Sequence, residues 1–366
     1  MQLLQSNLKT TLPVGEVHYT NLELLQLLGL QDTTRIYSRT ALLAMVAARE
    51  AFNNAKLDSQ PKHRMGMFGG TSVGGMDMGE TFYKYYLAGD YNHHLNYASV
   101  HDCGESTECV ADMLGIKDFI TTISTACSSA ANAIMQASKM IQLGLLDTAI
   151  AGGADAFSLF TLNGFNSLKI LSDEFCKPFD QHRKGLNLGE GAGFIVLESE
   201  EMVEKYRKTP LAEVTGYGNA CDAFHQTGSS ADGQGAWLAM NAAIAQSGLT
   251  PEEIGYINMH GTATPNNDMS EGTAVKRIFH NGAPAFSSTK AYTGHTLAAS
   301  GGIEAVFCTL ALQHGVAFPN LNFQTPIEEL GLVPATDIIS IPNLKHVLSN
   351  SFGFGGNNTS LVFSKC

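Results

Sequence analysis

Short apolar runs alternate with helical segments along almost all of this 366-residue chain. Runs typical of buried strands occupy residues 65–71, 118–124, 148–153, 193–197, 211–218, 254–259 and 359–363. The segments between them with the residue spacing of helices are 40–56, 128–141, 236–246, 268–279 and 303–312. Strands that alternate with helices in this way form mainly parallel, buried sheets. The pattern therefore predicts an α/β protein.

The chain is longer than one simple domain usually is. Hydrophobic residues make up 44% and charged residues 15% of it, and its 37 glycines suit a compact enzyme with many tight turns. A charged break lies at residues 205–210. We therefore expect two halves, residues 1–208 and 209–366.

The charge and the cysteines exclude several classes of function. A net charge of -12 argues against nucleic acid as a partner. The sequence contains no run of eighteen apolar residues, so no membrane-spanning helix is predicted. The seven cysteines are scattered and form no Cys-x-x-Cys pair, so neither a disulfide framework nor a metal site is expected. We expect a protein of the reducing cytoplasm.

Cys127 lies between a predicted strand and a predicted helix, with the small residues Ala126 and Ser128 on either side. Unpaired N–H groups and the helix dipole favour negative charge at a helix N-terminus. We therefore expect a thiol with a lowered pKa, suited to act as a nucleophile. An inert, buried cysteine explains the position equally well.

Two histidines lie beside glycines. His260 directly follows the predicted strand at 254–259, and ligand-contacting groups gather at the carboxyl ends of parallel strands. His295 ends the segment 287–295, which also contains Lys290. We expect Lys290 to pair with Glu271 on the predicted helix at 268–279, because a buried charge needs a partner. For His260, a histidine that is merely hydrogen-bonded in a turn is the alternative.

A glycine-rich segment, residues 350–358, precedes the last predicted strand. Its three glycines and two phenylalanines predict a flexible loop with bulky apolar tips. Such a loop would offer a backbone N–H donor beside an aromatic gate. An ordinary glycine-rich turn is the alternative.

Taken in order, four motifs resemble those of the β-ketoacyl-acyl-carrier-protein synthases, the type II ketosynthases of the thiolase superfamily. They are Thr-Ala-Cys-Ser-Ser at 125–129, His-Gly-Thr-Ala-Thr-Pro at 260–265, Lys-Ala-Tyr-Thr-Gly-His at 290–295 and Asn-Ser-Phe-Gly-Phe-Gly-Gly at 350–356. Supporting matches are Pro-Phe-Asp at 178–180 and Leu-Gly-Glu-Gly-Ala-Gly at 188–193. The resemblance extends over roughly residues 30–364.

The resemblance implies a thiolase-like, five-layered αβαβα core made from two similar halves. The N-terminal half would carry the nucleophilic cysteine, and the C-terminal half the histidine, Lys-His and Gly-Phe-Gly-Gly motifs. The Val-rich strand that opens family members is missing here, so the N-terminal strand is expected to be shortened. A thiolase proper would carry a second cysteine where this chain has Phe352 and Phe354.

The resemblance also assigns roles to individual residues. The catalytic residues would be Cys127, His260, His295 and Lys290, with Glu271 and Asp268 in support. Backbone N–H groups of Cys127 and Phe354 would form the oxyanion hole, and the Phe354 ring would be the gate. Thr262 and Thr264 would bind pantetheine, and Lys169 and Arg39 would dock the carrier protein.

The function implied is a decarboxylative Claisen condensation of a malonyl-carrier protein with an acyl group held on Cys127, in fatty-acid or polyketide biosynthesis. No bound cofactor is implied, because acyl carrier protein presents the substrates on phosphopantetheine. The partners would be acyl carrier protein and a second copy or homologous subunit. Two alternatives are a non-elongating, chain-length-setting subunit and a Cys-His acyltransferase or hydrolase.

Overall fold

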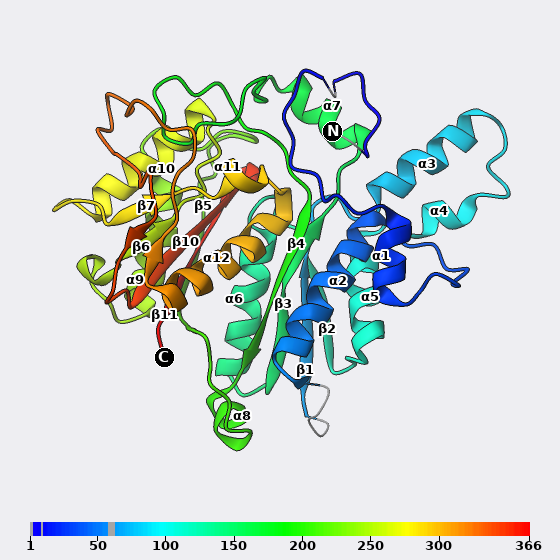
Figure 1. Ribbon diagram of the computed structural model, residues 1–366, viewed down its shortest axis with the longest axis horizontal. Coiled ribbons are helices and arrows are strands. Elements are labelled where there is room, and N and C mark those ends of the chain that lie inside the picture. The colour runs from blue at the N-terminus through cyan, green and yellow to red at the C-terminus, as the bar shows by residue number, and fades with distance from the viewer. Residues whose placement is uncertain (1–2, 9, 58–62) are drawn as a thin grey trace.

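A computed structural model describes residues 3–8, 10–57 and 63–366 (Figure 1). The N-terminal sheet has the strand order β2-β1-β3-β4. Its strands are β1 (Met65–Gly70), β2 (Phe119–Ile123), β3 (Thr148–Asp155) and β4 (Gly191–Glu198). β1 is parallel to β2 and β3, whereas β4 is antiparallel to β3. Each of these strands contains one of the apolar runs seen in the sequence.

The C-terminal sheet has the order β5-β11-β10-β6-β7. Its strands are β5 (Glu213–Cys221), β6 (Tyr256–Asn258), β7 (Ala285–Ser287), β10 (His346–Gly353) and β11 (Asn357–Ser364). β6 is parallel to β7 and β10, but β11 is antiparallel to both of its neighbours. Both sheets are thus mixed, and the prediction of mainly parallel sheets is partly wrong. The three residues of η4 (Phe354–Gly356) between β10 and β11 are too few for a crossover.

Helices cover both sheets and fill the space between them (Figure 1). α2 (Arg39–Asn54) and α5 (Cys103–Leu114) pack on the outer face of the N-terminal sheet. α6 (Ser129–Gln142) and α12 (Ser300–His314) lie between the sheets. α9 (Gln234–Gln246) packs on the C-terminal sheet, with α10 (Pro265–Ile278) against it. The expected five-layered αβαβα architecture is confirmed.

Small residues allow the two central helices to approach closely. A Cβ atom added to Gly301 would lie 2.8 Å from the backbone nitrogen of Ala131 on the other helix. Ala130, Ala133 and Ala137 of α6 are fully buried. This close contact brings the N-terminal ends of α6 and α12, one from each half, to the same region of the molecule.

The remaining helices and the shortest strands lie outside these layers. They are α1 (Asn21–Leu28), α3 (Met76–Leu87), α4 (Leu95–Ser99), α7 (Leu159–Ser167), α8 (Glu200–Lys205), α11 (Lys290–Thr293), the pair β8 (Val316–Ala317) and β9 (Ile339–Ser340), η2 (Pro251–Glu253) and η3 (Leu297–Ala299). α3 and α4 project as an arm at the right of Figure 1.

The N-terminal sheet has one strand fewer than the C-terminal sheet. β4 occupies the place that β11 has in the other half, and β11 pairs on its far side with β5. Among the described residues β4 pairs only with β3, and the described part of residues 3–57 holds helices and one isolated bridge but no strand. The described part of this segment thus adds no strand beside β4, and the expectation of a shortened N-terminal strand stays a prediction.

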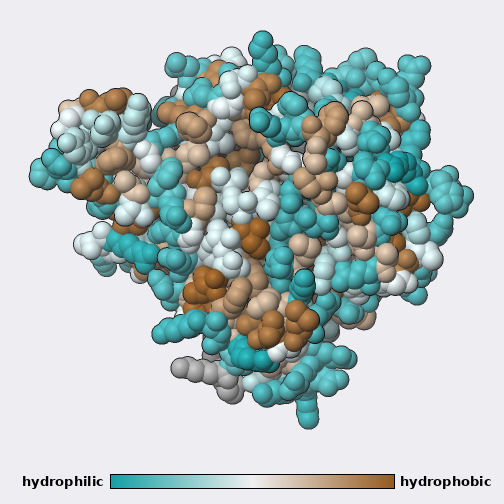
Figure 2. All heavy atoms as spheres, turned by 180° about the vertical axis from the view of Figure 1, so that it is seen from behind, coloured by the Kyte–Doolittle hydropathy of each residue, from teal (hydrophilic) through white to brown (hydrophobic). Residues whose placement is uncertain are grey.

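The last strand of the N-terminal sheet ends at Glu198, and the first strand of the C-terminal sheet begins at Glu213. A division at residues 208 and 209 remains our proposal for the boundary. None of the helices in the described part of the chain combines the length and apolar character needed to cross a bilayer. Apolar residues gather in patches at the centre and lower part of the rear face, among polar ones (Figure 2).

Candidate active site

Cys127 lies in the turn that joins β2 to α6, and its side chain is buried. Ala126 adopts a left-handed conformation with φ 52°, which is uncommon for a residue with a Cβ atom. The Ser129 hydroxyl stabilises this turn by accepting from the Thr125 backbone N–H at 2.9 Å and donating to the Ala126 carbonyl at 2.6 Å. The sulfur is therefore held in a fixed place at the start of a central helix.

Burial raises the pKa of the Cys127 thiol from 9.0 to about 12. The positive charge of Lys290 and backbone hydrogen bonds from Phe354 and Cys127 act in the opposite direction but do not outweigh burial. The prediction of a lowered thiol pKa is wrong in this structure. Cys127 is a neutral thiol at pH 7 and needs a base in order to become a nucleophile.

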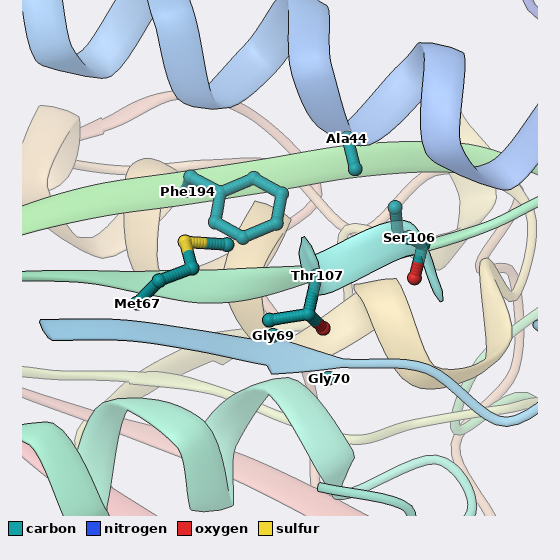
Figure 3. A pocket seen from close by; sticks show the side chains of 8 residues that line it. Ala44, Met67, Gly69, Gly70, Ser106, Thr107 and Phe194 are labelled. Carbon is teal, nitrogen blue, oxygen red and sulfur yellow. The ribbon is translucent and has the colours of Figure 1, made fainter. Parts of the chain in front are cut away.

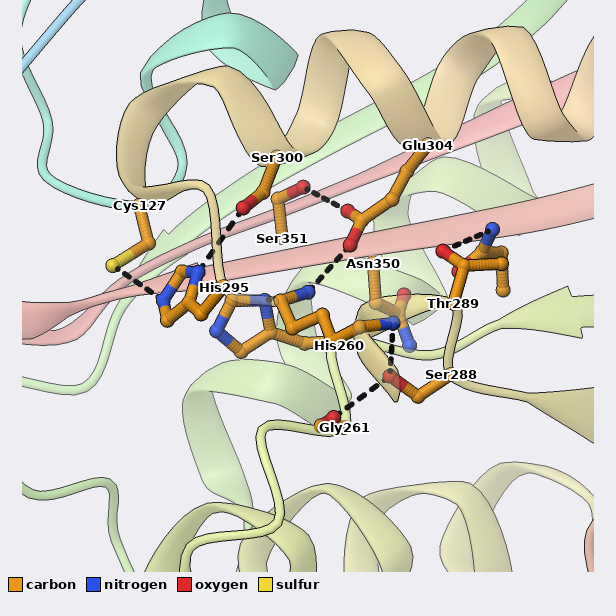
Figure 4. A network of polar contacts seen from close by, with 12 residues as sticks. Cys127, His260, Gly261, Ser288, Thr289, His295, Ser300, Glu304, Asn350 and Ser351 are labelled. Carbon is orange, nitrogen blue, oxygen red and sulfur yellow. Dashed lines mark hydrogen bonds and ion pairs between the residues drawn. The ribbon is translucent and has the colours of Figure 1, made fainter. Parts of the chain in front are cut away.

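His295 provides a base within reach of this thiol (Figure 4). Its Nε2 lies 3.1 Å from the Cys127 sulfur, and its Nδ1 lies 3.1 Å from the Ser300 hydroxyl. The His295 backbone N–H donates to the carbonyl of Asn187 at 2.7 Å, which ties the histidine to the N-terminal half. Both halves therefore contribute to the placement of this side chain.

His260 follows β6, as the sequence predicts, and its ring lies edge-on to that of His295 with 5.4 Å between the ring centroids. Burial lowers the pKa of both histidines well below 6.5, and the charge of Lys290 lowers both further. Both imidazoles are consequently neutral at pH 7, and each has one N–H to donate and one nitrogen to accept.

Lys290 forms an ion pair with Glu304 on α12, not with Glu271. Its ammonium also lies 3.3 Å from Nδ1 of His260, so it contacts this histidine rather than His295. Both side chains of the ion pair are almost completely buried. The predicted Lys290–Glu271 pair is wrong, because the Glu271 carboxylate binds backbone groups instead.

Glu271 holds the His260 turn through its two carboxylate oxygens. One oxygen accepts from the His260 N–H and the other from the Gly261 N–H, both at 2.8 Å. The Asn350 amide also donates to this carboxylate at 3.0 Å. Burial raises the pKa of Glu271 to about 7, although these hydrogen bonds lower it. Its supporting position beside His260 agrees with the prediction.

Asp268 lies one turn earlier on α10 and supports the next part of the same loop. Its carboxylate accepts from the Phe179 N–H at 2.8 Å and from the Ala263 N–H at 3.1 Å. The Arg183 guanidinium lies 3.7 Å away. Asp268 therefore connects the loop after β6 to a segment of the N-terminal half.

Residues 350–353 belong to β10, so the long flexible loop predicted at 350–358 is wrong; the turn comprises only residues 354–356. The Phe354 backbone N–H lowers the pKa of the Cys127 thiol, and the Phe354 ring stacks on Phe165 of α7 at 5.8 Å. A Cβ atom at Gly353 would lie 2.7 Å from the Thr125 carbonyl oxygen. The absence of a side chain there lets the hairpin turn approach the nucleophile.

Thr262 and Thr264 lie in the loop between His260 and α10. Their hydroxyls are 2.9 Å apart, and Thr264 also caps α10 by accepting from the Asn267 N–H. Thr264 is partly exposed, whereas Thr262 is buried. The two side chains are therefore adjacent, and the outer one reaches the surface near His260.

The two basic residues predicted to dock a carrier protein differ in their surroundings. Arg39 is only partly exposed and pairs with Glu190 at 2.6 Å, while its guanidinium donates to the Tyr19 and Val17 carbonyls. It fastens the N-terminal segment, which leaves little of its guanidinium free for the predicted docking role; that role stays a prediction. Lys169 is exposed just after α7, the helix that carries Phe165.

Sequence reasoning missed three polar residues around the site: Glu304, Ser300 and Asn350. A sequence signal was available for Glu304, because it is the one charged residue in the otherwise apolar predicted helix at 303–312. Asn350 opens the glycine-rich motif at 350–356, but no role was assigned to it. Ser300 is a common polar type at a position that the sequence pattern does not set apart.

A cavity of about 10 Å³ lies between α2, α5 and the N-terminal sheet, beside Gly69 and Thr107 (Figure 3). This volume holds about one water molecule, so the cavity is far too small for an acyl chain. No group of His, Cys, Asp and Glu side chains suited to a metal ion occurs in the part of the chain that the structure describes.

Comparison with known families covers most of the chain. Residues 30–202 match the family described as "Beta-ketoacyl synthase, N-terminal domain", and residues 211–324 match "Beta-ketoacyl synthase, C-terminal domain". The chain is 36% identical over 346 residues to 3-oxoacyl-[acyl-carrier-protein] synthase 2 of Staphylococcus aureus (strain COL). That match spans 90% of this chain and 83% of the relative.

Two solved structures have the same fold over nearly the whole chain. The ishigamide ketosynthase/chain length factor matches with a TM-score of 0.86 and 29% identity, over 90% of this chain and 83% of that one. The ketosynthase ApeO from Xenorhabdus doucetiae, solved with its chain length factor ApeC, matches with a TM-score of 0.85 and 32% identity, over 97% and 87%.

Proposed function

Because this chain belongs to the β-ketoacyl synthase family, we propose that Cys127, His260 and His295 carry out the decarboxylative Claisen condensation typical of these acyltransferases. The observation that carries the proposal is the placement of two neutral histidines around one buried thiol. His295 Nε2 is 3.1 Å from the sulfur, and the His260 ring is 5.4 Å from that of His295. A Cys-His hydrolase would have no need for the second histidine or its buried lysine.

In the first half-reaction Cys127 takes the acyl group. The thiol proton passes to His295 Nε2 as the sulfur attacks the thioester carbonyl. The N–H groups of Cys127 and Phe354 stabilise the tetrahedral oxyanion, and one such donor is typically worth about 3 kcal/mol. The departing pantetheine thiolate takes the proton back from His295, which leaves an acyl-Cys127 thioester.

In the second half-reaction a malonyl thioester enters the site. The N–H groups of His260 and His295 hydrogen-bond its thioester carbonyl, and carbon dioxide leaves as the enolate forms. Neutral imidazoles suit this role because each offers a donor. The enolate carbon attacks the acyl-Cys127 carbonyl, and the cysteine sulfur departs as a thiolate. A proton from water then restores the Cys127 thiol, replacing the one that left with the pantetheine thiol. The product is a β-ketoacyl thioester.

Thr262 and Thr264 lie on the approach to His260, where their hydroxyls would hydrogen-bond the pantetheine arm. Phe354 would act as the gate for the acyl chain, because its ring closes on Phe165 and glycines flank it on both sides. Of the two residues predicted to contact an acidic carrier protein, the exposed Lys169 near this entrance is the better placed.

The substrates would arrive on acyl carrier protein, as the name of the Staphylococcus aureus relative indicates, and no resident cofactor is needed. A second subunit, identical or homologous, would associate with the chain, because both solved relatives were obtained with a chain length factor. Within the described part of the chain β2 pairs on one side only, with β1, so its outer edge could make this contact; Ile120 on it is 41% exposed. With Cys127, His260 and His295 all present, this chain takes the condensing role rather than the chain-length-setting one.

All seven cysteines are free in the structure, which fits the cytoplasm as the place of action.

Intact mass after incubation with an acyl-carrier-protein thioester tests the nucleophile. Wild type should gain one acyl group, and Cys127→Ala should gain none. Cys366→Ala removes an exposed thiol far along the chain and serves as the matched control, which should acylate normally. Acylation of the Cys127→Ala variant would refute the assignment.

His260→Ala separates the two half-reactions. The variant should retain acylation of Cys127 and lose condensation, because it is His295 that lies beside the sulfur, at 3.1 Å, while His260 faces His295 across the site. Release of carbon dioxide together with a lengthened chain measures condensation. Condensation at the wild-type rate in this variant would disprove the role of His260.

A further inference from the structure

The Nδ1 atoms of the two histidines face partners of different kinds (Figure 4). Nδ1 of His260 lies 3.3 Å from the Lys290 ammonium, which donates hydrogen bonds and cannot accept them. Nδ1 of His260 must therefore be the acceptor, and its proton is confined to Nε2. The ion pair with Glu304 holds this ammonium in place.

His295 has no such constraint. Its Nδ1 lies 3.1 Å from the Ser300 hydroxyl, which both donates and accepts. The Thr296 hydroxyl lies 3.2 Å from the same Ser300 oxygen, so a second hydroxyl is available to take the complementary role. Ser300 and Thr296 are both buried. The imidazole of His295 can thus carry its proton on either nitrogen and remain hydrogen-bonded at Nδ1.

The proposed chemistry needs both forms of His295. During acylation Nε2 must have a free lone pair, because it takes the proton of the Cys127 thiol 3.1 Å away. During condensation Nε2 must carry a proton, because it donates to the malonyl thioester carbonyl. A partner that only donates, such as a lysine, would allow the second form alone.

We propose that Ser300 is a positioning residue whose hydroxyl reverses its hydrogen bond to His295 and so lets this histidine serve both half-reactions. The inference rests on the proposed function of Cys127 and His295. With the proton on Nδ1, the Ser300 oxygen accepts from it and Nε2 is the base. With the proton on Nε2, the Ser300 hydroxyl donates to Nδ1 and Nε2 is the donor.

Loss of the Ser300 hydroxyl should affect the two forms unequally. A buried N–H without a partner is costlier than an unpaired lone pair. Ser300→Ala should therefore favour the form with its proton on Nε2, which cannot accept the thiol proton. We expect acylation of Cys127 about tenfold slower, as the loss of one buried hydrogen bond predicts. Condensation by enzyme that is already acylated should stay within about twofold of wild type.

Time-resolved intact mass measures acylation by an acyl-carrier-protein thioester, and single-turnover product formation from acyl-enzyme and malonyl-carrier protein measures condensation. Ser300→Thr keeps the hydroxyl and should acylate at close to the wild-type rate, unlike Ser300→Ala. Ser300→Cys, with a weakly hydrogen-bonding thiol, should behave like the alanine variant. Ser138→Ala removes a buried α6 hydroxyl that donates to the Ile134 carbonyl and should leave both rates unchanged. Equal slowing of both half-reactions by Ser300→Ala would overturn the proposal.

Nitrogen-15 NMR of histidine-labelled enzyme without substrate reports the proton position directly. The His295 signals are assigned by their disappearance in His295→Gln among the 12 histidines. Wild type should show both forms of His295 in exchange, and Ser300→Ala only the form protonated at Nε2. An identical pattern in the two proteins would also overturn the proposal. This measurement needs no acyl transfer, so it stands even if Cys127 proves not to be the nucleophile.

Discussion

Replacing Glu304 with glutamine leaves the Lys290 ammonium in the protein interior without its counter-ion. The Lys290 and Glu304 side chains are only 2% and 3% exposed, so water cannot take over the role of the lost carboxylate. Breaking a buried ion pair from one side typically costs about 3–5 kcal/mol. We therefore expect Glu304→Gln to lower the free energy of unfolding at pH 7 by roughly 3 kcal/mol.

The double variant Lys290→Met, Glu304→Leu separates the contribution to stability from the contribution to chemistry. Replacing both members of a buried pair by apolar residues of similar volume is often neutral or stabilising. The double variant should thus unfold within about 1 kcal/mol of wild type. Condensation should nevertheless fall by roughly 10²-fold, because nothing then confines the His260 proton to Nε2.

Urea unfolding at pH 7 measures stability, and single-turnover condensation from acyl-enzyme measures the chemistry. Acylation of Cys127 in the double variant is the internal control and should change far less than condensation. Wild-type condensation in the folded double variant would refute the argument that the ion pair sets the His260 proton. A double variant as unstable as Glu304→Gln would show that the pair is not a simple buried charge pair.

Burial raises the pKa of Glu271 from 4.5 to about 7, so the folded state keeps a proton that the unfolded chain has already lost between these pH values. The free energy of unfolding should therefore fall by roughly 3 kcal/mol as pH rises from about 4.5 to 7. Urea unfolding should show this loss in wild type but not in Glu271→Gln. Gly353→Ala places a Cβ atom 2.7 Å from the Thr125 carbonyl and should slow acylation at least tenfold, whereas Gly228→Ala, with only ordinary contacts, should not; equal rates would contradict the packing argument. Lys169→Glu should raise KM for acyl carrier protein severalfold without changing kcat. Arg39→Ala should lower the melting temperature without changing that KM. A raised KM in Arg39→Ala together with an unchanged KM in Lys169→Glu would instead make Arg39 the docking residue.

Local sequence patterns predicted most of the helices and strands, because the buried residues of each element follow the spacing of apolar residues within that element. Every apolar run in the sequence became a strand, and the helix predicted at 303–312 lies within α12. The positions of Cys127 and His260 at the ends of elements were predictable for the same reason. Strand directions were not, because β4 and β11 turn antiparallel through connections that the apolar pattern does not distinguish from crossovers.

The partner of Lys290 could not be predicted, because two acids on two predicted helices were available. Glu271 lies closer to His260 in sequence, but both of its oxygens are used by backbone N–H groups. Glu304 reaches Lys290 only because α12 lies between the two sheets. Which carboxylate a buried lysine meets is thus decided by layer packing, about which a single sequence says little.

The partners of Arg39 could not be predicted from the sequence either. An arginine at the start of a helix is expected to be solvated, and the sequence contains no sign of the carbonyls of Tyr19 and Val17 around it. Only the three-dimensional arrangement brings Glu190 from a distant segment to the same place.

The thiol of Cys127 shows how magnitudes decide between two valid effects. A helix N-terminus stabilises a nearby negative charge by about 0.3–1 kcal/mol, up to about 2 in buried geometries. Raising the thiol pKa from 9.0 to about 12 corresponds to roughly 4 kcal/mol against ionisation. Burial therefore wins, and no standing thiolate is exposed to oxidation or to unproductive reaction. The Cys127 thiolate must therefore form when the thioester is bound. His295, which takes the proton, and the Ser300 hydroxyl at its Nδ1 then determine when the nucleophile is generated.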